Sequence, residues 1–403
     1  MKALTLLSLL LVSFSLLANE NNASLDTYLS DLKKKQFDYD YNKNDEESSQ
    51  LRDSWIAPLQ LSYSYSKSDP YGTEQTTQNA AIKMSQPIFQ SGGIYYGIRY
   101  ANALKLYNDY TIDVAKRKMI KDTVSILMQL KKADLQEKRQ VLQIENADIN
   151  LAQKQEEYLS GRLDSGFLDD AIIQRNVVKQ ALFDIQNSKE ELITQFQVLS
   201  DLDYTKAPIP YLEFIKEEDF LKNNIVLKQN ESQIEKDRYY KNVTIAKYLP
   251  QVSFNAGYNW QKSEGQLFSQ TDGERDYYNY GVSVSMPLDI NMFNDIASVR
   301  IDYLKSQVVQ EDKKLELTKT FEQVLHNIDN IDKKIKLSSE NMELYAKLLD
   351  DTKSLYDAGY KTEYDVENLQ NSLDIQKIDT KIYEIDKQLE LLTLYEMYVN
   401  NGE

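Results

Sequence analysis

The sequence predicts an α+β protein made of two similar halves, each containing two β-strands, one very long helix and one shorter helix. Segments that alternate apolar and small polar residues occur in two pairs. Each pair is followed by a proline-free stretch in which apolar residues recur at spacings of three and four, and both stretches end in Tyr-x-x-Gly. A shared order of elements in the two halves indicates an internal tandem duplication.

The composition favours an elongated, largely helical chain over a set of compact domains. The 403 residues include only 12 Gly and 7 Pro, and 27% of them are charged. Few turn-forming residues leave little chain for many short elements, and abundant charge fits a surface that is large relative to the core. The net charge of −16, without a basic patch, argues against nucleic acid as a partner.

The chemistry of the side chains excludes most enzyme classes. The chain has no Cys and a single His, His326, which falls within a helical pattern. Disulfides, thiolate metal sites and histidine clusters are therefore not expected. A glycine-rich phosphate loop and a nucleophile–base set are also missing, and the carboxylates follow helix surfaces. We expect no enzymatic activity, no cofactor and no metal site.

The first 18 residues predict a secretory signal peptide. Lys2 supplies the positive end, residues 3–17 form the apolar core, and Ala18 is the expected cleavage position. A membrane anchor is the alternative, but the apolar run is short for a spanning helix. No later segment is apolar over 18 residues, so no transmembrane helix is expected.

Four alternating segments predict strands at about 58–66, 79–88, 250–261 and 277–288. In the third, Val252, Phe254, Tyr258 and Trp260 alternate with small polar residues, whereas Gln86 interrupts the pattern of the second. One apolar face, one small polar face and aromatic residues near one end are typical of outer-membrane barrel strands. A soluble antiparallel sandwich alternates in the same way. The signal peptide favours the membrane interpretation.

Heptad spacing predicts long helices at about 94–158 and 294–356 and shorter ones at about 167–200 and 363–398. In the first, Met128, Leu135, Leu142 and Ile149 recur every seven residues, which is typical of coiled-coil-like packing. At 1.5 Å per residue, a helix of about sixty residues is roughly 90 Å long. One compact core cannot cover such a helix.

The two halves define the expected domain organisation. The first repeat covers residues 19–205 and the second residues 226–403, joined by a linker at 206–225 that contains Pro208 and Pro210. The equivalent prolines of the two halves, which precede and close the strand pairs, are Pro58 and Pro250, then Pro87 and Pro287.

The segment after Pro87 marks a change from strand to helix. A proline removes a backbone donor and is tolerated at the end of a ladder. Gly92 and Gly93 then allow the backbone to turn into the first long helix. Pro287 has the same expected role in the second half, without following glycines.

A barrel of this kind requires more than one chain. Four short strands cannot close a membrane barrel, since about eight is the practical minimum. An open sheet edge in lipid leaves backbone groups unpaired at several kcal/mol each. Three copies would give twelve strands around a water-filled lumen, and two copies a barrel filled by side chains.

Four motifs carry a family resemblance. In order along the chain they are QPIFQSGG at 86–93, YLPQVSFNAGYNW at 248–260, YGVSVSMPL at 280–288 and YDAGYKTEYDV at 356–366. Their order, spacing and duplication resemble the TolC-type outer-membrane efflux proteins over nearly all of the mature chain. The resemblance implies a homotrimer with a twelve-stranded barrel in outer-membrane lipid, continued by a long α-helical periplasmic tunnel.

The resemblance also implies a function and partners. A TolC-like chain is the exit duct of a tripartite efflux or type I secretion system in a Gram-negative-type envelope, and it exports solutes passively. A periplasmic adaptor protein and an inner-membrane pump would dock at the periplasmic end. The alternatives are an adaptor-like protein and a structural coiled-coil protein without a pore.

The resemblance places a gate after the second Tyr-x-x-Gly turn. Asp365 matches an acidic residue that narrows the entrance, and Asn368 falls where the family has a second aspartate. Lys361 occupies the place of a basic residue that holds the closed state. Tyr356 matches a tyrosine that links to the other repeat, with Asp169 as its expected partner.

The residues around Asp365 also allow a purely local interpretation. Thr362-Glu363-Tyr364-Asp365 fits a capping box, with Thr362 as N-cap. Three Asp365 carboxylates near one axis would attract cations, and both roles can hold together. Gly161 and Gly359 are expected to form the turns that end the long helices.

Overall fold

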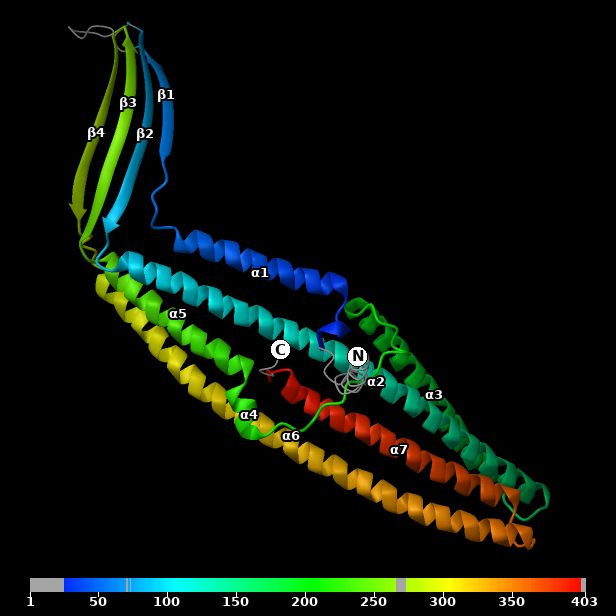
Figure 1. The fold of residues 1–403 in the computed structure, drawn as a ribbon. Coiled ribbons are helices and arrows are strands. Elements are labelled where there is room, and N and C mark those ends of the chain that lie inside the picture. The colour runs from blue at the N-terminus through cyan, green and yellow to red at the C-terminus, as the bar shows by residue number, and fades with distance from the viewer. Residues whose placement is uncertain (1–24, 70–71, 73, 266–272, 400–403) are drawn as a thin grey trace, which may run out of the picture. The chain divides into compact units, whose positions relative to one another are not determined.

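The computed structural model describes residues 25–69, 72, 74–265 and 273–399, so the expected signal peptide lies outside the described residues. The chain runs through two similar series of helices and strands (Figure 1). The elements are η1 (Leu25–Tyr28), α1 (Asp31–Arg52), β1 (Gln60–Ser68), β2 (Gln75–Phe89), α2 (Gly93–Leu159), α3 (Ser165–Leu199), α4 (Glu217–Lys222), α5 (Ile225–Lys247), β3 (Gln251–Glu264), β4 (Gly273–Ser285), α6 (Met292–Asp357) and α7 (Glu363–Tyr395).

The structure adds a helix before each strand pair, which the sequence analysis did not predict. These are α1 and α5, and α4 lies within the segment expected to be a linker. The four long helical predictions agree with α2, α3, α6 and α7 within three residues at each end. The strands differ more, because β2 begins four residues before its predicted start and β4 ends at Ser285, before Pro287.

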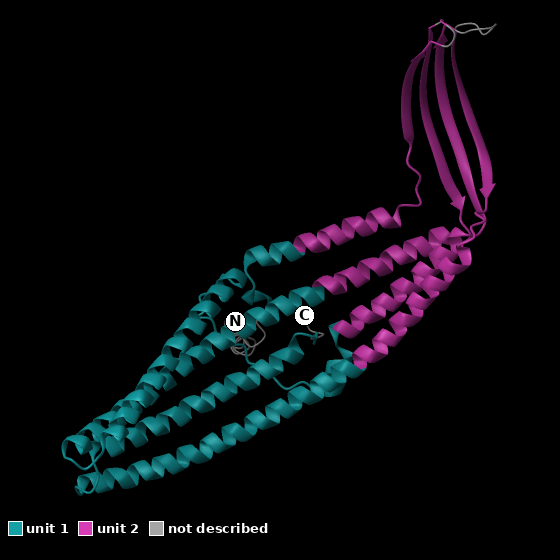
Figure 2. Cartoon of the chain, turned by 180° about the vertical axis from the view of Figure 1, so that it is seen from behind, with its two compact units in different colours: residues 1–37, 113–225, 315–403 teal, residues 38–112, 226–314 magenta. Residues whose placement is uncertain are grey.

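The chain forms two compact units (Figure 2). One contains residues 25–37, 113–225 and 315–399 of the described chain, and the other residues 38–112 and 226–314. The long helices α2 and α6 contribute to both units. No helix in the described residues combines the length and apolar character needed to cross a membrane.

The second unit carries one antiparallel sheet in the order β1-β2-β3-β4. Residues directly opposite one another in such a ladder point to the same face. The register aligns Leu61, Ile82, Tyr258 and Tyr278 in one row across all four strands. Neighbouring rows on this face add Tyr63, Trp260, Phe254, Tyr280 and Val282, so this face is apolar and aromatic except for charged residues near the β3–β4 connection.

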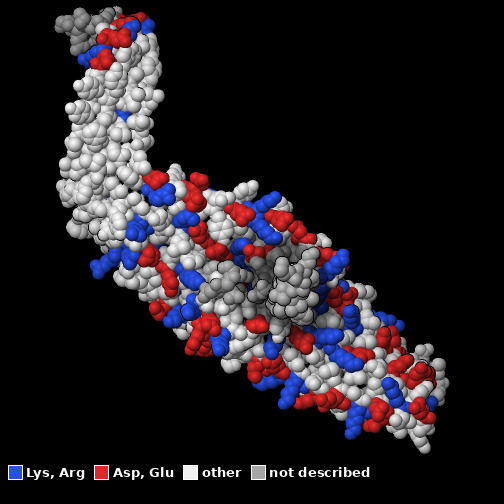
Figure 3. All heavy atoms as spheres, in the orientation of Figure 1, with Lys and Arg blue, Asp and Glu red and all other residues white. Residues whose placement is uncertain are grey.

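The opposite face of the sheet carries mainly small polar residues, and several of them bond across the strands. The Ser85 hydroxyl donates to Asn255 at 2.7 Å, and the Asn255 amide donates to Ser283 at 2.9 Å. Asn259 donates to Asn279 in the same way at 2.9 Å. Uncharged atoms dominate the surface over the strands, whereas charges of both signs cover the helices (Figure 3).

Gln86 and Pro87 show why the pattern of β2 is irregular. Gln86 lies in an apolar row opposite Phe254, but its side chain accepts from the Ala57 backbone at 2.9 Å and donates to the Trp55 carbonyl at 3.0 Å. It therefore ties the α1–β1 connection to β2. The expectation that Pro87 ends the ladder is wrong by two residues, because β2 continues to Phe89. The register shifts after Pro87, and this irregularity accommodates the missing donor.

At the end of β2 the backbone turns as the glycines suggested. Ser91 and Gly92 have φ values of +50° and +91°, and α2 begins at Gly93. A Cβ on Gly92 would lie 3.2 Å from the Tyr96 ring. The Ser91 hydroxyl donates to the Pro250 carbonyl at 2.6 Å, which joins the β2–α2 connection to the α5–β3 connection.

In the first unit the helices bury a conventional apolar core. Leu127 and Met128 of α2 and Leu394 of α7 are fully buried. Phe220 of α4 stacks on Phe321 of α6 with ring centroids 5.5 Å apart. Burial of aromatic and aliphatic side chains is the main stabilising contribution here.

Candidate functional site

The two turns that follow the long helices have the same backbone geometry. Gly359 has φ of +78°, its N–H donates to the Tyr356 carbonyl at 2.8 Å, and the Tyr360 N–H donates to the Leu355 carbonyl at 2.8 Å. This is the Schellman pattern, in which a left-handed glycine closes the helix. Gly161 has φ of +70° and forms the equivalent pair of bonds at 2.9 Å each, with Tyr158 and Glu157 as acceptors.

The helices that follow these turns are capped differently. Each N-cap residue lies three positions after the glycine, at Asp164 and at Thr362. Asp164 accepts a hydrogen bond from the Gly166 N–H at 2.8 Å. Thr362 forms a complete capping box with Asp365, as the sequence predicted. The α2–α3 and α6–α7 turns therefore share a backbone geometry and differ in the side chains that cap the following helix.

Asp365 is held by three donors. Its Oδ2 accepts from the Thr362 N–H at 3.0 Å and from the Thr362 hydroxyl at 2.9 Å, and its Oδ1 lies 3.7 Å from Lys361 Nζ. The Thr362 backbone donor, followed by the hydroxyl and the lysine, lowers the pKa of Asp365 below its ordinary value. The carboxylate is therefore charged at neutral pH, and a third of its side chain is exposed.

The remaining predicted gate residues are exposed and less constrained. Asn368 lies three residues after Asp365 on α7, and its carbonyl accepts from Ser372 at 2.7 Å within the helix. Tyr356 and Asp169 are also exposed, and in the described part of this single chain they form no hydrogen bond with each other. Whether these three residues belong to a gate stays a prediction.

A different tyrosine joins the two halves near the turns. The Tyr364 hydroxyl donates to Glu156 Oε1 at 3.3 Å, which connects the start of α7 to the end of α2. The nearby Glu156 carboxylate raises the pKa of Tyr364. The sequence contained no signal for this pair, because the two residues are 208 positions apart.

Ion pairs continue the contact between α2 and α7 away from the turns. Lys132 Nζ lies 2.6 Å from Asp386 Oδ1, and Arg139 donates to Asp379 Oδ1 at 3.0 Å. All four side chains are mostly buried, so these pairs are screened less than surface pairs. They hold the first and second halves together within this unit.

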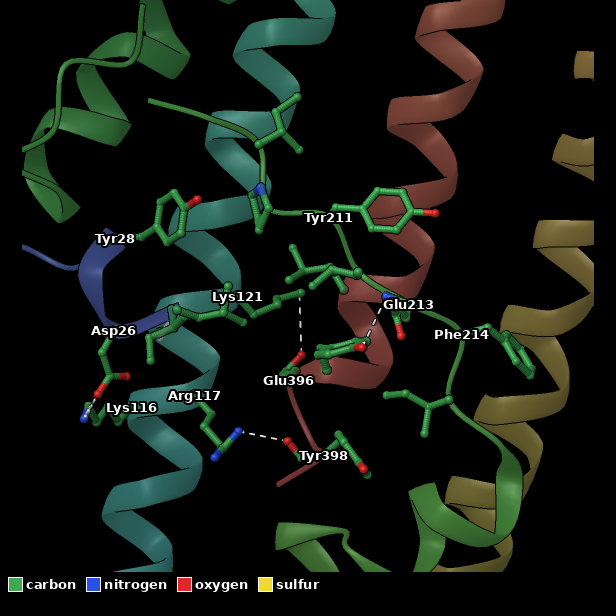
Figure 4. A pocket seen from close by; sticks show the side chains of 18 of the residues that line it. Asp26, Tyr28, Lys116, Arg117, Lys121, Tyr211, Glu213, Phe214, Glu396 and Tyr398 are labelled. Atoms are coloured by element: carbon green, nitrogen blue, oxygen red, sulfur yellow. Dashed lines mark hydrogen bonds and ion pairs between the residues drawn. The ribbon is translucent and has the colours of Figure 1, made fainter. Parts of the chain in front are cut away.

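A cavity of about 810 Å³ lies beside the linker in the same unit. Three cations from α2 point into it, and each has a partner (Figure 4). Lys116 lies 2.6 Å from Asp26, Arg117 donates to the Tyr398 carbonyl at 2.9 Å, and Lys121 lies 3.8 Å from Glu396. These contacts attach η1 and the segment after α7 to α2, and paired cations leave little positive charge for a ligand.

The described residues contain no group of three or more His, Asp or Glu side chains arranged to hold a metal ion. The side chains that gather at the turns are instead carboxylates, lysine and tyrosine with water-exposed surfaces. Such a group can attract or repel solutes and can hold helices together. It has no nucleophile–base arrangement for covalent chemistry.

Comparison with known proteins finds a family match over the second half of the chain and supports the fold. Residues 218–398 match the model of the outer membrane efflux protein family. No curated protein sequence is significantly similar to the chain.

Three solved structures are similar along most of the chain. The outer membrane protein VceC from Vibrio cholerae has 13% identity and a TM-score of 0.70, covering 91% of this chain and 93% of that one. The Campylobacter jejuni CmeC outer membrane channel has 14% identity and a TM-score of 0.72, covering 92% and 84%. The open state of the Neisseria gonorrhoeae MtrE outer membrane channel has 13% identity and a TM-score of 0.65, covering 92% and 87%. These likenesses confirm the fold predicted from the sequence.

Proposed function

We propose that this chain, whose residues 218–398 match the outer membrane efflux protein family, forms the exit duct of a tripartite efflux or type I secretion system. In this proposal three chains contribute their sheets to a twelve-stranded barrel in the outer membrane. Their long helices form a tunnel through the periplasm. Solutes pass through passively, and other proteins supply the energy.

The observation that carries the proposal is the two-faced sheet with open edges. One face is apolar and aromatic and the other is polar and hydrogen-bonded across the strands. In the described sheet β1 and β4 each pair with one strand only. Lipid would leave the outer edges of these strands without hydrogen-bond partners, at several kcal/mol for each group. Pairing with strands of neighbouring copies removes that cost.

Exposed apolar residues on the helices support the same assembly. Ile173 and Phe183 of α3 and Leu337 and Leu344 of α6 are all more than half exposed in the single chain. Isolated apolar residues on a surface are ordinary, but repeated ones along two long helices indicate a covered surface. Contact between α3 and α6 of adjacent copies in a homotrimer would bury them.

The turns at the ends of the long helices would lie at the periplasmic entrance. Asp365 with its lysine, together with Asn368, Tyr356 and Asp169, would form or border the gate there. A periplasmic adaptor protein and an inner-membrane pump are the partners expected at this end. The alternatives of an adaptor-like protein or a poreless coiled coil are disfavoured, because neither uses a duplicated strand pair with one aromatic face.

The test compares two neighbouring substitutions in β4 after reconstitution of the mature chain. Val282 lies on the apolar face, and Gly281 lies on the polar face with open space where a Cβ would be. A lysine facing lipid near the bilayer centre costs about 2–4 kcal/mol. We expect Gly281→Lys to give detergent-stable trimers that conduct ions in planar bilayers. Val282→Lys should assemble or insert poorly.

The measurements are mass by light scattering in detergent and single-channel conductance. A wild-type protein that is a water-soluble monomer without conductance would contradict the proposal. Equal insertion of both lysine variants would contradict the assignment of the two faces. The wild-type chain is the positive control in both measurements.

A further inference from the structure

The charged residues on the polar face of the sheet are all cations. In the described strands, the residues of this face that carry charge are Lys83 of β2 and Arg275 of β4. Arg275 donates to Gln261 Oε1 at 2.8 and 3.2 Å, and neither cation has a carboxylate within salt-bridge distance among the described residues. Such a bias is unexpected in a chain with a net charge of −16.

The acidic residues of the strands lie on the other face. Their cross-strand partners belong to the apolar face: Asp276 is opposite Trp260, Glu274 is opposite Lys262, and Glu264 is opposite Thr76. They are also neutralised or bonded there: Lys262 Nζ lies 2.7 Å from Glu264, and the Trp260 indole donates to Glu274 at 2.6 Å. The polar face therefore keeps its positive charge uncompensated by acids of the sheet.

Lys83 has small neighbours on β2 and β3 and an uncharged one on β1. Gly257 is its direct partner on β3, Gln60 is its partner on β1, and Ala81 and Ser85 flank it on the same face of β2. A Cβ on Gly257 would meet Asn279 Oδ1 at 2.7 Å, so the asparagine leans over the glycine. The Lys83 side chain is exposed and longer than the side chains of these neighbours. Its ammonium group is thus free to extend toward water.

We propose that Lys83 is a selectivity residue that makes the barrel lumen favour anionic solutes over cations. The inference rests on the proposed function, because three chains are needed to bring three Lys83 ammonium groups around one lumen. Arg275 forms a second level of positive charge, four residues along the strands and so about 13 Å away. This spacing is near the Debye length at 0.1 M salt, so the two levels act separately at high salt and together at low salt.

The test measures reversal potentials of the reconstituted trimer in a potassium chloride gradient. Lys83→Gln removes the charge, Lys83→Glu reverses it, and Lys83→Arg retains it. Lys262→Gln is the matched control, because it removes a lysine from the same sheet on the opposite face, where Glu264 pairs with it. Measurements at two ionic strengths separate the effect of charge from the effect of side-chain size.

We expect Lys83→Gln to lower the ratio of chloride to potassium permeability roughly two- to fourfold at 0.1 M salt. Lys83→Glu should lower it further, and both effects should grow in dilute salt. Lys83→Arg and Lys262→Gln should match the wild type. If wild type and Lys83→Gln conduct with the same permeability ratio, the inference is wrong while the duct stands. A wild-type protein without conductance overturns the duct and this inference together.

Discussion

Replacing Asp365 with asparagine separates its two candidate roles. Asparagine keeps a side-chain oxygen that can accept from the Thr362 N–H, which the carboxylate binds at 3.0 Å. It loses the negative charge that lies 3.7 Å from Lys361 Nζ. The matched variant is Thr362→Ala, which removes the capping hydroxyl and retains the charge. If Asp365 borders the duct, Asp365→Asn should therefore change the response of the channel to cations, whereas Thr362→Ala should change mainly the thermal stability.

The expected magnitudes follow from these contacts. Loss of an N-cap hydroxyl costs about 1 kcal/mol of helix stability, so Thr362→Ala should lower the unfolding temperature more than Asp365→Asn does. A unit charge 4 Å from a carboxylate gains about 1 kcal/mol in water. Three carboxylates, offset by Lys361 and by screening at a partly exposed site, would contribute about 1–2 kcal/mol to binding a blocking cation. Asp365→Asn should weaken that blockade roughly tenfold.

The pH dependence has a definite sign. Hydrogen bonds from Thr362 lower the pKa of Asp365, so the folded protein retains this charge at pH values where an ordinary aspartate is half protonated. Its stabilising contribution is complete above the unfolded-state pKa and is lost as pH falls through the lower folded-state value. Cation blockade should persist to the same lower pH. Asp365→Asn should lack this acidic transition.

The assay is single-channel recording with a multivalent cation added on the turn side, from neutral pH to about pH 3, where ordinary aspartates become protonated. Melting curves of the same three proteins give the stability comparison. Unchanged blockade and selectivity in Asp365→Asn would return Asp365 to a capping role alone. Thr362→Ala retains the Asp365 carboxylate. If this variant also shows weaker cation blockade, the geometry of the turn, and not the charge of Asp365, determines the blockade.

Three other changes test separate contacts. Tyr364→Phe removes the hydroxyl that binds Glu156 and should raise spontaneous channel opening roughly two- to tenfold, whereas Glu156→Gln keeps an acceptor and should have a smaller effect. Gln86→Ala removes two hydrogen bonds to the α1–β1 connection and should destabilise the trimer by about 1–3 kcal/mol in thermal unfolding; an unchanged melting temperature would show that the connection is held elsewhere. In this cysteine-free chain, Lys83→Cys should react with a charged, water-soluble thiol reagent and Ile82→Cys should not; equal reaction would contradict the facing of β2.

The strands were predictable because alternation is a local property. Val252 to Trp260 show it directly, and the register places their apolar members on one face. Gln86 was an exception that the sequence could not explain. Its partners are backbone groups of Trp55 and Ala57, about thirty residues earlier, and a local pattern contains no information about them. The mismatch marked a specific contact between a strand and the preceding connection.

Helix α1 was missed because only one of its buried residues, Phe37, is apolar, whereas the buried Asn44 and Ser48 are polar. Asn44 donates to the Lys105 carbonyl at 3.0 Å and to Asp109 at 2.8 Å, and Ser48 donates to the Ala101 carbonyl at 3.3 Å. An apolar stripe with helical spacing is the usual sequence signal, and here hydrogen bonds replace it. The buried Ser232 on α5 presents the same difficulty.

The site was predictable where its contacts are local. The capping box at Thr362 was identified because its partners are three residues apart. The Tyr364–Glu156 bond depends on how the two halves pack, which a repeat pattern does not specify. Tyr356, chosen for its place in the turn motif, contributes its backbone carbonyl to the Schellman turn instead of a side-chain bond in the single chain.

The duplication accounts for the shared helices, turns and strands. The charged residues Asp365 and Lys83 each occur in one half only. Counting from either N-cap, the first-half counterpart of Asp365 is Phe167, and the residue 200 positions after Lys83 is Ser283. In the proposed trimer the backbone would repeat six times around the axis, whereas each charged level would have three groups. A sixfold ring of carboxylates or ammonium groups would repel itself more strongly and would resist closure. Divergence of one half at each level halves the number of charges and therefore lowers their mutual repulsion by more than half, while both halves retain the same turns and strands.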